Sequence, residues 1–278
     1  MLFDAHCHLS LLKKTYPQVF IAAVSMDFAS SLDTISLKSD TVLTGIGLHP
    51  WNANKENLEK FELLLDKADF IGEVGLDFKY SNADKDTQIG TFNFFLERTF
   101  KKTINVHALE AWKEALDILK EASVERALLH WYSGPPELLK NIQELGYFIS
   151  INPSVTFQEK HRKIAQLAPL EIIVTESDGG YEYKGKILEP TQINDTIDFL
   201  SQLKKIDKEE IKKIIEKILK NYIIYDNFIY LEVNEAEDYK GGIDSSILKT
   251  YKPHFDFAVW ALRTFIVISI KPLDFTTF

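Results

Sequence analysis

Cysteine is nearly absent from this sequence of 278 residues, because Cys7 is the only one. A single cysteine excludes an intrachain disulfide framework and makes a reducing compartment the default. The N-terminus lacks the charged, apolar and small-residue sections of a signal peptide. The longest apolar-rich stretch, residues 258–270, is short for a membrane span and contains Arg263. We therefore expect a cytoplasmic protein without a membrane segment.

Basic residues are in deficit, with 32 lysines and arginines against 41 aspartates and glutamates and a net charge of −9. This balance argues against broad, non-specific binding of nucleic acid, which needs a positively charged surface. A narrow phosphate site stays open, because a bound metal pair carries more local positive charge than several lysines. The hydrophobic content of 45% and the length suit an ordinary globular protein the size of one barrel.

Short apolar runs alternate with longer helical patterns over residues 1–222. The strand candidates are residues 2–4, 19–25, 42–47, 70–74, 104–107, 127–130, 147–151 and 172–176. The helix candidates are residues 56–68, 86–102, 110–122, 136–145, 157–167, 191–203 and 208–221. Eight strands, most of them separated by a helix, favour a parallel sheet closed by crossover connections. The sequence therefore predicts an α/β fold, a (β/α)₈ barrel.

The composition of the chain changes after about residue 222. Residues 223–233 are rich in isoleucine and tyrosine, an acidic stretch follows, and a second aromatic run starts at Phe255. Residues 264–270 are rich in β-branched side chains, which favour a strand. We predict a barrel over residues 1–222 and a C-terminal extension over 223–278 that packs on the barrel or on a protein partner.

Two histidines near the N-terminus, His6 and His8, stand two residues apart on a predicted strand. Side chains alternate along a strand, so both imidazoles face the same way and can reach one cation. Other candidates each end or follow a short apolar run: Glu73, His107, His130 and Asp178. A (β/α)₈ barrel builds its site at such strand ends. A lone histidine is more often a hydrogen-bonded core residue, but the whole set indicates a metal centre.

Five motifs carry a family resemblance: Asp4-Ala5-His6-Cys7-His8-Leu9, Gly47-Leu48-His49-Pro50, Gly72-Glu73-Val74-Gly75-Leu76-Asp77, His130-Trp131-Tyr132-Ser133-Gly134 and Thr175-Glu176-Ser177-Asp178. Their order and spacing resemble those of the TatD-type metal-dependent deoxyribonucleases over residues 1–220. Gln88, Phe92 and Phe95-Leu96 resemble the helix that follows that family's third ligand segment. The His130 motif, with Ile149-Ser150-Ile151-Asn152-Pro153 after it, is similar to the branch associated with Qat anti-phage defence operons.

The resemblance implies a distorted TIM (β/α)₈ barrel of the metallo-dependent hydrolase type with two divalent cations. It implies that Glu73 bridges the two cations and that the other ligands divide between them, His6, His8 and Asp178 on the first and His107 and His130 on the second. This ligand set suits zinc, manganese or magnesium, and zinc best. Two metals about 3.5–4 Å apart can lower the pKa of a shared water and stabilise the oxygens of a phosphodiester. Glu73 and Asp178 are the catalytic candidates, with Asp178 able to take the water's proton.

Three neighbours of the ligands have two readings each. His49 lies in a Gly-Leu-His-Pro turn and either contacts substrate or only shapes the turn. Asp77 and Glu176 either orient ligand imidazoles by accepting their remote N–H or are buried structural acids. Cys7 lies on the opposite strand face from its neighbours and is expected to be a small core residue.

Two departures from the family pattern concern the substrate. The Ser-Arg-Asp common after the histidine matching His107 is Ala108-Leu109-Glu110 here, so a natural phosphate contact is missing. After Asp178 the usual Ala-Pro-Tyr is replaced by Gly179-Gly180-Tyr181. A basic loop is reduced to residues 184–190, where Lys184 and Lys186 either meet phosphates or are only solvated.

Three functions remain open at this point. The leading one is a two-metal phosphodiesterase acting on DNA, on single strands or ends, with four aromatic residues that either stack on bases or pack at the barrel rim: Trp51, Trp131, Tyr132 and Tyr181. The second is an amidohydrolase-like enzyme acting on a small ester, lactone or amide, which the acidic charge balance favours slightly. The third is a metal-binding subunit of a defence complex.

Overall fold

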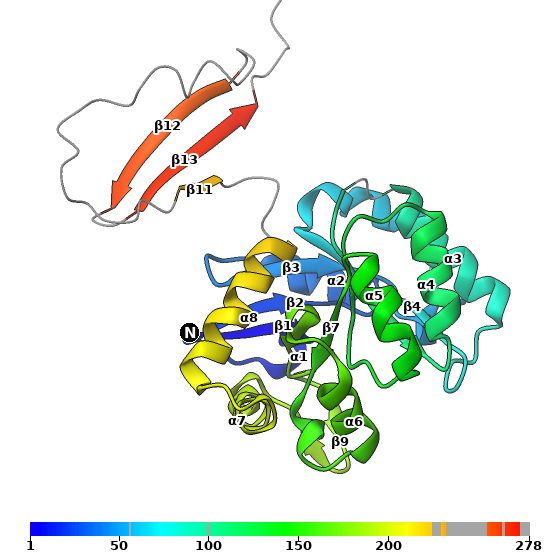
Figure 1. Ribbon diagram of the computed structural model, residues 1–278. Coiled ribbons are helices and arrows are strands. Elements are labelled where there is room, and N and C mark those ends of the chain that lie inside the picture. Colours follow the sequence, from blue (N-terminus) through cyan, green and yellow to red (C-terminus); the bar gives the residue numbers. More distant parts are fainter. Residues whose placement is uncertain (56, 99–100, 224–228, 232–254, 263–264, 273–278) are drawn as a thin grey trace, which may run out of the picture. The chain divides into compact units, whose positions relative to one another are not determined.

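Eight parallel strands form the centre of the N-terminal part in this computed structural model (Figure 1). The structure describes residues 1–55, 57–98, 101–223, 229–231, 255–262 and 265–272. The central strands are β1 (Leu2–Cys7), β2 (Val19–Ala23), β3 (Val42–Ile46), β4 (Phe70–Asp77), β5 (Ile104–Leu109), β6 (Ala127–Leu129), β7 (Phe148–Ile151) and β8 (Ile173–Thr175). Each strand pairs in parallel with the next one in the chain, so the predicted distorted (β/α)₈ barrel is confirmed.

The barrel closes between β8 and β1 through a few individual bonds. The Thr175 hydroxyl donates to the carbonyl of Phe3 at 2.6 Å, and the backbone amide of Asp178 donates to the carbonyl of His6 at 3.0 Å. Asp4 accepts from the backbone amide and the hydroxyl of Ser177, at 2.9 and 2.5 Å. These contacts, which we call the seam, hold the first and last ligand segments side by side.

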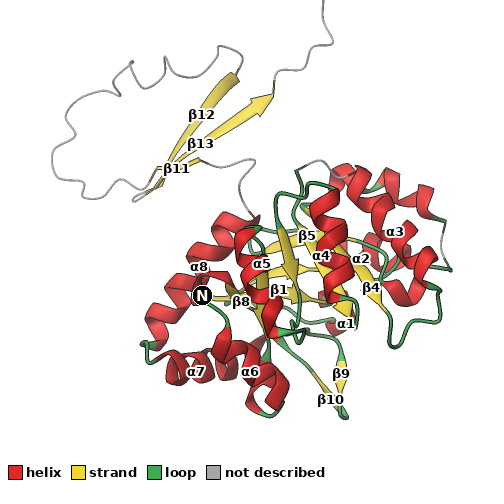
Figure 2. Ribbon diagram, turned by 45° about the vertical axis from the view of Figure 1, so that its right-hand side comes forward, coloured by secondary structure: helices red, strands yellow, loops and turns green. Residues whose placement is uncertain are grey.

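Helices cover the outside of the strands (Figure 2). They are α1 (Leu9–Leu12), α2 (Phe28–Ser36), α3 (Lys85–Arg98), α4 (Trp112–Glu121), α5 (Leu139–Glu144), α6 (Glu159–Leu167), α7 (Ile193–Lys204) and α8 (Lys208–Ile223). In α4, Ala115, Leu116 and Leu119 are buried, as the three- and four-residue spacing of its apolar side chains dictates. Asp27 and Ser30 form a capping box that fixes the start of α2.

Residues 57–68 differ from the single helix that the sequence predicts over 56–68. They form two short 3₁₀ helices, Leu58–Leu63 and Leu65–Lys67. The apolar residues Leu58, Phe61 and Leu64 recur every third position and pack against the core. That period matches three residues per turn better than the 3.6 of an α-helix, so burial of this stripe favours the 3₁₀ form.

Residues 224–278 make a compact unit of their own, and residues 1–223 make the other. The described part of the C-terminal unit is a three-stranded antiparallel sheet of β11 (Ile229–Leu231), β13 (Phe265–Pro272) and β12 (Phe255–Leu262), in that order. The expectation that residues 223–278 pack on the barrel or on a partner stays a prediction, and the stretch 232–254 lies outside the described residues. Among the helices of the described ranges, none combines the length and the apolar character that a bilayer crossing needs.

Candidate metal centre

The six predicted ligands gather at one end of the barrel, where the strands finish. His6 is on β1 and His8 follows it, Glu73 is on β4, His107 on β5, His130 follows β6, and Asp178 follows β8. Glu73 and His130 are 2% and 6% exposed, and the others are buried or nearly so. Buried charged side chains are costly unless they are paired or bind a metal, so this gathering calls for a positive charge among them.

Four ligand atoms form the first cluster. The Nε2 atoms of His6 and His8 lie 3.4 Å apart, and both lie 3.4 Å from Oδ1 of Asp178. Oε2 of Glu73 is 3.6 Å from His6 Nε2 and 3.4 Å from His8 Nε2. Ligands at about 2.0–2.1 Å around a tetrahedral zinc stand about 3.4 Å from one another. The donor atoms and their spacing therefore fit one divalent cation.

Three atoms form the second cluster around the other oxygen of Glu73. Its Oε1 is 2.9 Å from Nδ1 of His107 and 2.9 Å from Nε2 of His130, and these two nitrogens are 3.2 Å apart. Atoms that all present lone pairs approach this closely only when a proton or a cation lies between them. Glu73 thus offers one oxygen to each cluster, which fits a bridging carboxylate.

Hydrogen bonds on the far side of the rings set which nitrogen of each histidine is free. Asn105 donates its amide N–H to the carbonyl of Ala5 at 2.9 Å, so its Oδ1 accepts from His6 Nδ1 at 2.8 Å. Asp77 Oδ2 accepts from His107 Nε2 at 3.1 Å. The proton of each neutral ring is therefore held away from the clusters, and the lone pair faces them.

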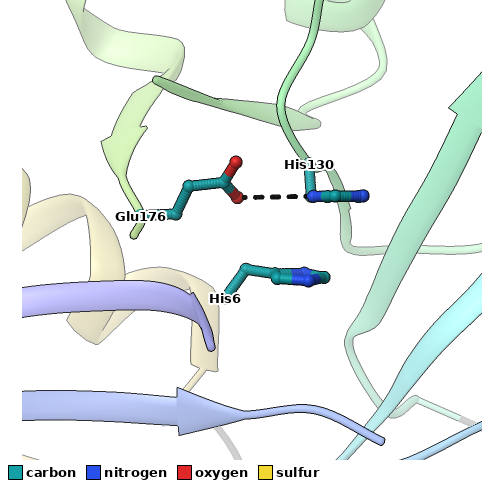
Figure 3. A group of neighbouring side chains, drawn as sticks. All are labelled: His6, His130 and Glu176. Carbon is teal, nitrogen blue, oxygen red and sulfur yellow. Dashed lines mark ion pairs between the residues drawn. The ribbon is translucent and has the colours of Figure 1, made fainter. Parts of the chain in front are cut away.

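Sequence reasoning missed Asn105, although the signal was there. It is a buried polar residue in the middle of an apolar strand, two positions before His107 and hence on the same strand face. Asp77 takes the position that its predicted orienting role requires, whereas Glu176 accepts hydrogen bonds from Trp131 and Ser150 and stands beside His130 without a hydrogen bond to it. Figure 3 shows the Glu176 carboxylate facing His130, whose Nδ1 lies 3.7 Å away, while the His6 ring stacks on His130 at 3.9 Å.

The backbone of β4 is shaped to deliver Glu73. The pairing of β4 with β5 shifts register between Ile71 and Val74, which is a bulge at the ligand. Gly75 has φ +137°, and a Cβ there would lie 2.0 Å from the carbonyl oxygen of His107. Only glycine lets the two ligand-bearing strands approach this closely, so the Gly-Glu-Val-Gly sequence is explained by the site.

Carboxylates and imidazoles shift each other's pKa in the clusters, in the directions that favour the charged forms. Burial alone would raise the pKa of Glu73, but His49, His130 and His6 outweigh it and hold that pKa well below its usual range. Burial likewise opposes the shift of His107, yet hydrogen bonds to Asp77 and Glu73 raise its pKa. The carboxylates therefore draw positive charge into this end of the barrel, which a divalent cation supplies more effectively than protons.

His49 lies at the clusters but is oriented as a donor. Its Nδ1 accepts the backbone N–H of Trp51 at 3.2 Å, in the turn that begins the 3₁₀ helix Pro50–Asn52. A neutral ring that accepts at Nδ1 carries its proton on Nε2, and Nε2 is 3.4 Å from Glu73 Oε1. His49 thus points an N–H at the bridging carboxylate rather than a lone pair. The Trp51 indole N–H donates to Asp77 at 2.6 Å and so fixes the carboxylate that also accepts from His107.

A cavity of about 760 Å³ opens above the clusters. Its walls include the ligands His8, Glu73, His107, His130 and Asp178, and further the residues His49, Trp51, Lys79, Leu109, Glu110, Lys113, Glu114, Trp131, Lys160, Tyr181, Glu182 and Tyr183. Three lysines and three glutamates outside the clusters balance each other in charge. Attraction of an anion into this cavity must therefore come from the metal centre, because the walls add no net positive charge.

Two of the five predicted substrate contacts line the cavity and three do not, and what they do toward a substrate stays a prediction. His49 and Trp131 line the cavity. Tyr132 is fully buried, packs edge-on against Trp112 and donates its hydroxyl to the carbonyl of Pro135 at 2.7 Å, so it is a core residue. Trp131 has a left-handed backbone conformation, with φ +41°. Its own side chain lines the cavity, whereas the side chain of Tyr132 packs in the core. Lys184 and Lys186 lie on the hairpin of β9 (Glu182–Tyr183) and β10 (Lys186–Ile187), outside the lining residues of the cavity.

Comparison with known proteins identifies the family. The model of the family described as "TatD related DNase" matches residues 3–223 of this chain. The chain belongs to the TatD family. The assignment to the Qat-associated branch stays a prediction.

Curated relatives of the TatD chain are named as metal-dependent hydrolases and deoxyribonucleases. An "uncharacterized metal-dependent hydrolase" of Methanocaldococcus jannaschii is 29% identical over 234 residues, which cover 77% of this chain and 93% of the relative. The human protein named deoxyribonuclease TATDN3 is 26% identical over 250 residues, which cover 77% of this chain and 91% of the relative. This TatD protein is therefore a member of a metal-dependent hydrolase family.

Solved TatD structures share the fold. YjjV, a TatD homologue from Escherichia coli, has a TM-score of 0.71 at 20% identity over 80% of this chain and 97% of its own. A TatD-family hydrolase from Entamoeba histolytica has a TM-score of 0.67 at 17% identity over 80% of this chain and 98% of its own. At these identities the likeness supports the barrel alone.

Replacing Asp77 by asparagine should weaken metal binding. The variant keeps the size of the side chain but loses the carboxylate that accepts from His107 Nε2, and such a partner contributes about 10–100-fold to metal affinity. Titration with a competing chelator measures the loss. Glu110→Gln, which alters a carboxylate on the same cavity wall that pairs with Lys79 rather than with an imidazole, is the control. Equal affinity of Asp77→Asn and the unaltered chain would refute the orienting role.

Proposed function

We propose that this TatD protein is a two-metal phosphodiesterase that cleaves DNA, on single strands or at strand ends. The observation that supports it most is the pair of ligand clusters that share Glu73, one on each carboxylate oxygen. That arrangement suits two divalent cations a short distance apart. The human relative named as a deoxyribonuclease supports DNA as the substrate.

The proposal assigns a task to each residue of the site. Glu73, His6, His8 and Asp178 would hold the first cation, and Glu73, His107 and His130 the second, with zinc the best match to four imidazoles. Bound cations would make a water more acidic and neutralise charge on the phosphodiester. Asn105 and Asp77 hold the imidazoles of His6 and His107 in the orientation that presents their lone pairs to the clusters, and Glu176 places its negative charge beside His130.

Asp178 is proposed to accept the proton of the attacking water. Burial alone would raise its pKa, but the neighbouring imidazoles of His6 and His8 hold that pKa below its usual range, so the side chain is ionised. Its φ of +54° places it on a tight turn after β8, at the edge of the cavity. A carboxylate in reach of both a cluster and the open cavity can pass a proton between them.

His49 is proposed to donate its Nε2–H to an oxygen of the substrate that is held beside Glu73. His49→Ala should keep the full metal content, because its lone pair is used by Trp51. Loss of a hydrogen bond to a charged oxygen, about 1.5–3 kcal/mol, should lower kcat/KM about 10–100-fold. Elemental analysis and steady-state kinetics measure both. His6→Ala, which removes a ligand, should lower the metal content, and loss of an ion in His49→Ala would make His49 a ligand.

The cavity favours an unpaired strand. Trp131 presents its ring at the wall, and base stacking on such a ring is tolerant of sequence. Leu109 and Glu110 occupy the stretch where the family commonly carries an arginine, so phosphate contacts outside the metal centre are few. Weak contacts to the backbone suit ends and single strands, which can enter a cavity that a duplex cannot.

The test combines elemental analysis with digestion. Protein purified without chelator should contain up to two divalent ions per chain. End-labelled single strands should be cut faster than duplexes, chelator should stop the reaction, and zinc, manganese or magnesium should restore it. A metal-loaded protein that cuts neither substrate would overturn the proposal.

A small-molecule hydrolase is the second candidate, and the balanced charge of the cavity walls with Leu109 among them favours it. In the wider amidohydrolase group a carboxylated lysine often bridges the metals, whereas Glu73 takes that place here. Hydrolysis of ester or lactone panels without cleavage of DNA would select this candidate. Metal binding with neither activity would select a non-catalytic subunit.

A further inference from the structure

Four aromatic rings form a row that starts in the cavity and leaves it. Trp131 lies 6.2 Å from Tyr181 and 5.6 Å from Tyr183, measured between ring centroids. Tyr183 in turn stacks on Phe157 at 5.7 Å with an interplanar angle of 22°. Trp131, Tyr181 and Tyr183 line the cavity, whereas Phe157 lies outside its lining and is 50% exposed.

The outer end of the row is built from two elements that lie side by side. The β9–β10 hairpin projects from the barrel next to α6 (Figure 2), and Gln158, just before α6, donates its amide to the Tyr183 hydroxyl at 2.7 Å. Lys184, at the tip of the hairpin, places its ammonium 5.4 Å from the Tyr183 ring and 5.7 Å from the Phe157 ring. A cation thus stands beside two stacked rings at the cavity mouth.

This combination has a specific ligand chemistry. Proteins that bind single-stranded nucleic acid combine aromatic faces, on which bases stack, with nearby cations that meet the phosphates. Packing of the hairpin alone would not require an exposed phenylalanine or a lysine held over the rings. An anion would also be attracted more strongly to Lys184 than to the lysines of the cavity walls, because glutamates stand among those lysines.

We propose that Phe157, Tyr183 and Lys184 form an outer nucleotide subsite, in which a base of a single strand stacks on the rings and Lys184 contacts its phosphate. The subsite rests on the proposed function, since it would hold the part of the strand that extends beyond the nucleotide at the metal centre. It gives the chain a preference for strands longer than the cavity can hold. It also assigns a role to Lys184 that the cavity itself does not.

The test compares two substrate lengths with the full metal-loaded chain. Phe157→Ala should raise KM for a single-stranded octanucleotide about 5–100-fold, the range of one lost stack. It should leave kcat, and the KM for a dinucleotide, unchanged. Phe157→Trp should restore the KM for the octanucleotide. Fluorescence anisotropy of a labelled octanucleotide in chelator provides the same comparison without turnover.

Lys184→Gln tests the phosphate contact. Binding of the octanucleotide by this variant should depend less on salt, with the slope of log K against log salt reduced by about 0.7 for one phosphate on a single strand.

Phe94→Ala is the matched control for Phe157→Ala. Phe94 on α3 also stands beside a cation, Arg98 at 4.0 Å, but lies away from the cavity. Equal effects of Phe157→Ala on both lengths, or none on either, would overturn the subsite. Absence of any cleavage or binding by the unaltered chain would instead refute the proposed function, and the subsite with it.

Discussion

Glu73→Ala should abolish turnover while the barrel stays folded. The variant removes the one side chain that contributes an oxygen to both ligand clusters, within 3.6 Å of His6 and within 3.4 Å of His8, His49, His107 and His130. Loss of several kcal/mol of transition-state stabilisation corresponds to about a thousandfold or more in rate. The metal content should fall as well, because each cluster loses a ligand. Steady-state kinetics and elemental analysis measure the two losses.

Folding of this variant is checked separately. Glu73 fills little of the core, and circular dichroism and thermal unfolding should resemble those of the unaltered chain. Glu110→Gln, on the cavity wall outside the clusters, should keep its metals. If Glu73→Ala retained undiminished metal-dependent turnover, the bridging assignment would be wrong.

Asp178→Asn should lower kcat by about 10²–10⁴-fold, the usual contribution of a positioned base. Asparagine has nearly the same shape but cannot take a proton from water at neutral pH. KM should change little if substrate binding depends on the other ligands and on the aromatic row. Rapid-quench measurement of a single turnover separates the chemical step from product release.

The control for Asp178→Asn is Asp117→Asn, which alters a half-exposed carboxylate paired with Lys113 at 2.5 Å on α4. It should leave kcat unchanged. If Asp178→Asn lost metal in proportion to activity, Asp178 would be a ligand alone and another group would have to accept the proton.

The positions of the ligands could be predicted because barrel physics restricts them. A charged side chain that ends an apolar run must be satisfied by something, and parallel strands bring all such ends together. The rule applies to all six predicted ligands, and the structure brings them into two adjoining clusters: His6, His8, Glu73, His107, His130 and Asp178. The Gly-Glu-Val-Gly pattern carried a further signal, since a Cβ at Gly75 would collide with the backbone carbonyl of His107 on the neighbouring strand.

The cavity walls could not be predicted in the same way. Which face of a loop looks inward depends on single dihedral angles, and at the left-handed Trp131 it is Trp131 that lines the cavity while Tyr132 is fully buried. Lys79, Lys113 and Lys160 reach the cavity from a loop and from two helices, because of how those elements are stacked. Nothing in the local sequence distinguishes them from Lys184, which stands outside the lining.

The first cluster is complete only after the seam between β8 and β1 has formed. Thr175 and Phe3, whose contact closes the barrel, are 172 positions apart in the chain. A growing polypeptide that has not yet reached residue 178 can bring His6 and His8 together but lacks the carboxylate that completes their cluster. Contacts of such separation form late, because the intervening loop must close first. A cation that bound only the closed form would stabilise it by mass action, so metal availability would set how strongly the equilibrium favours the closed barrel over forms in which the seam is open.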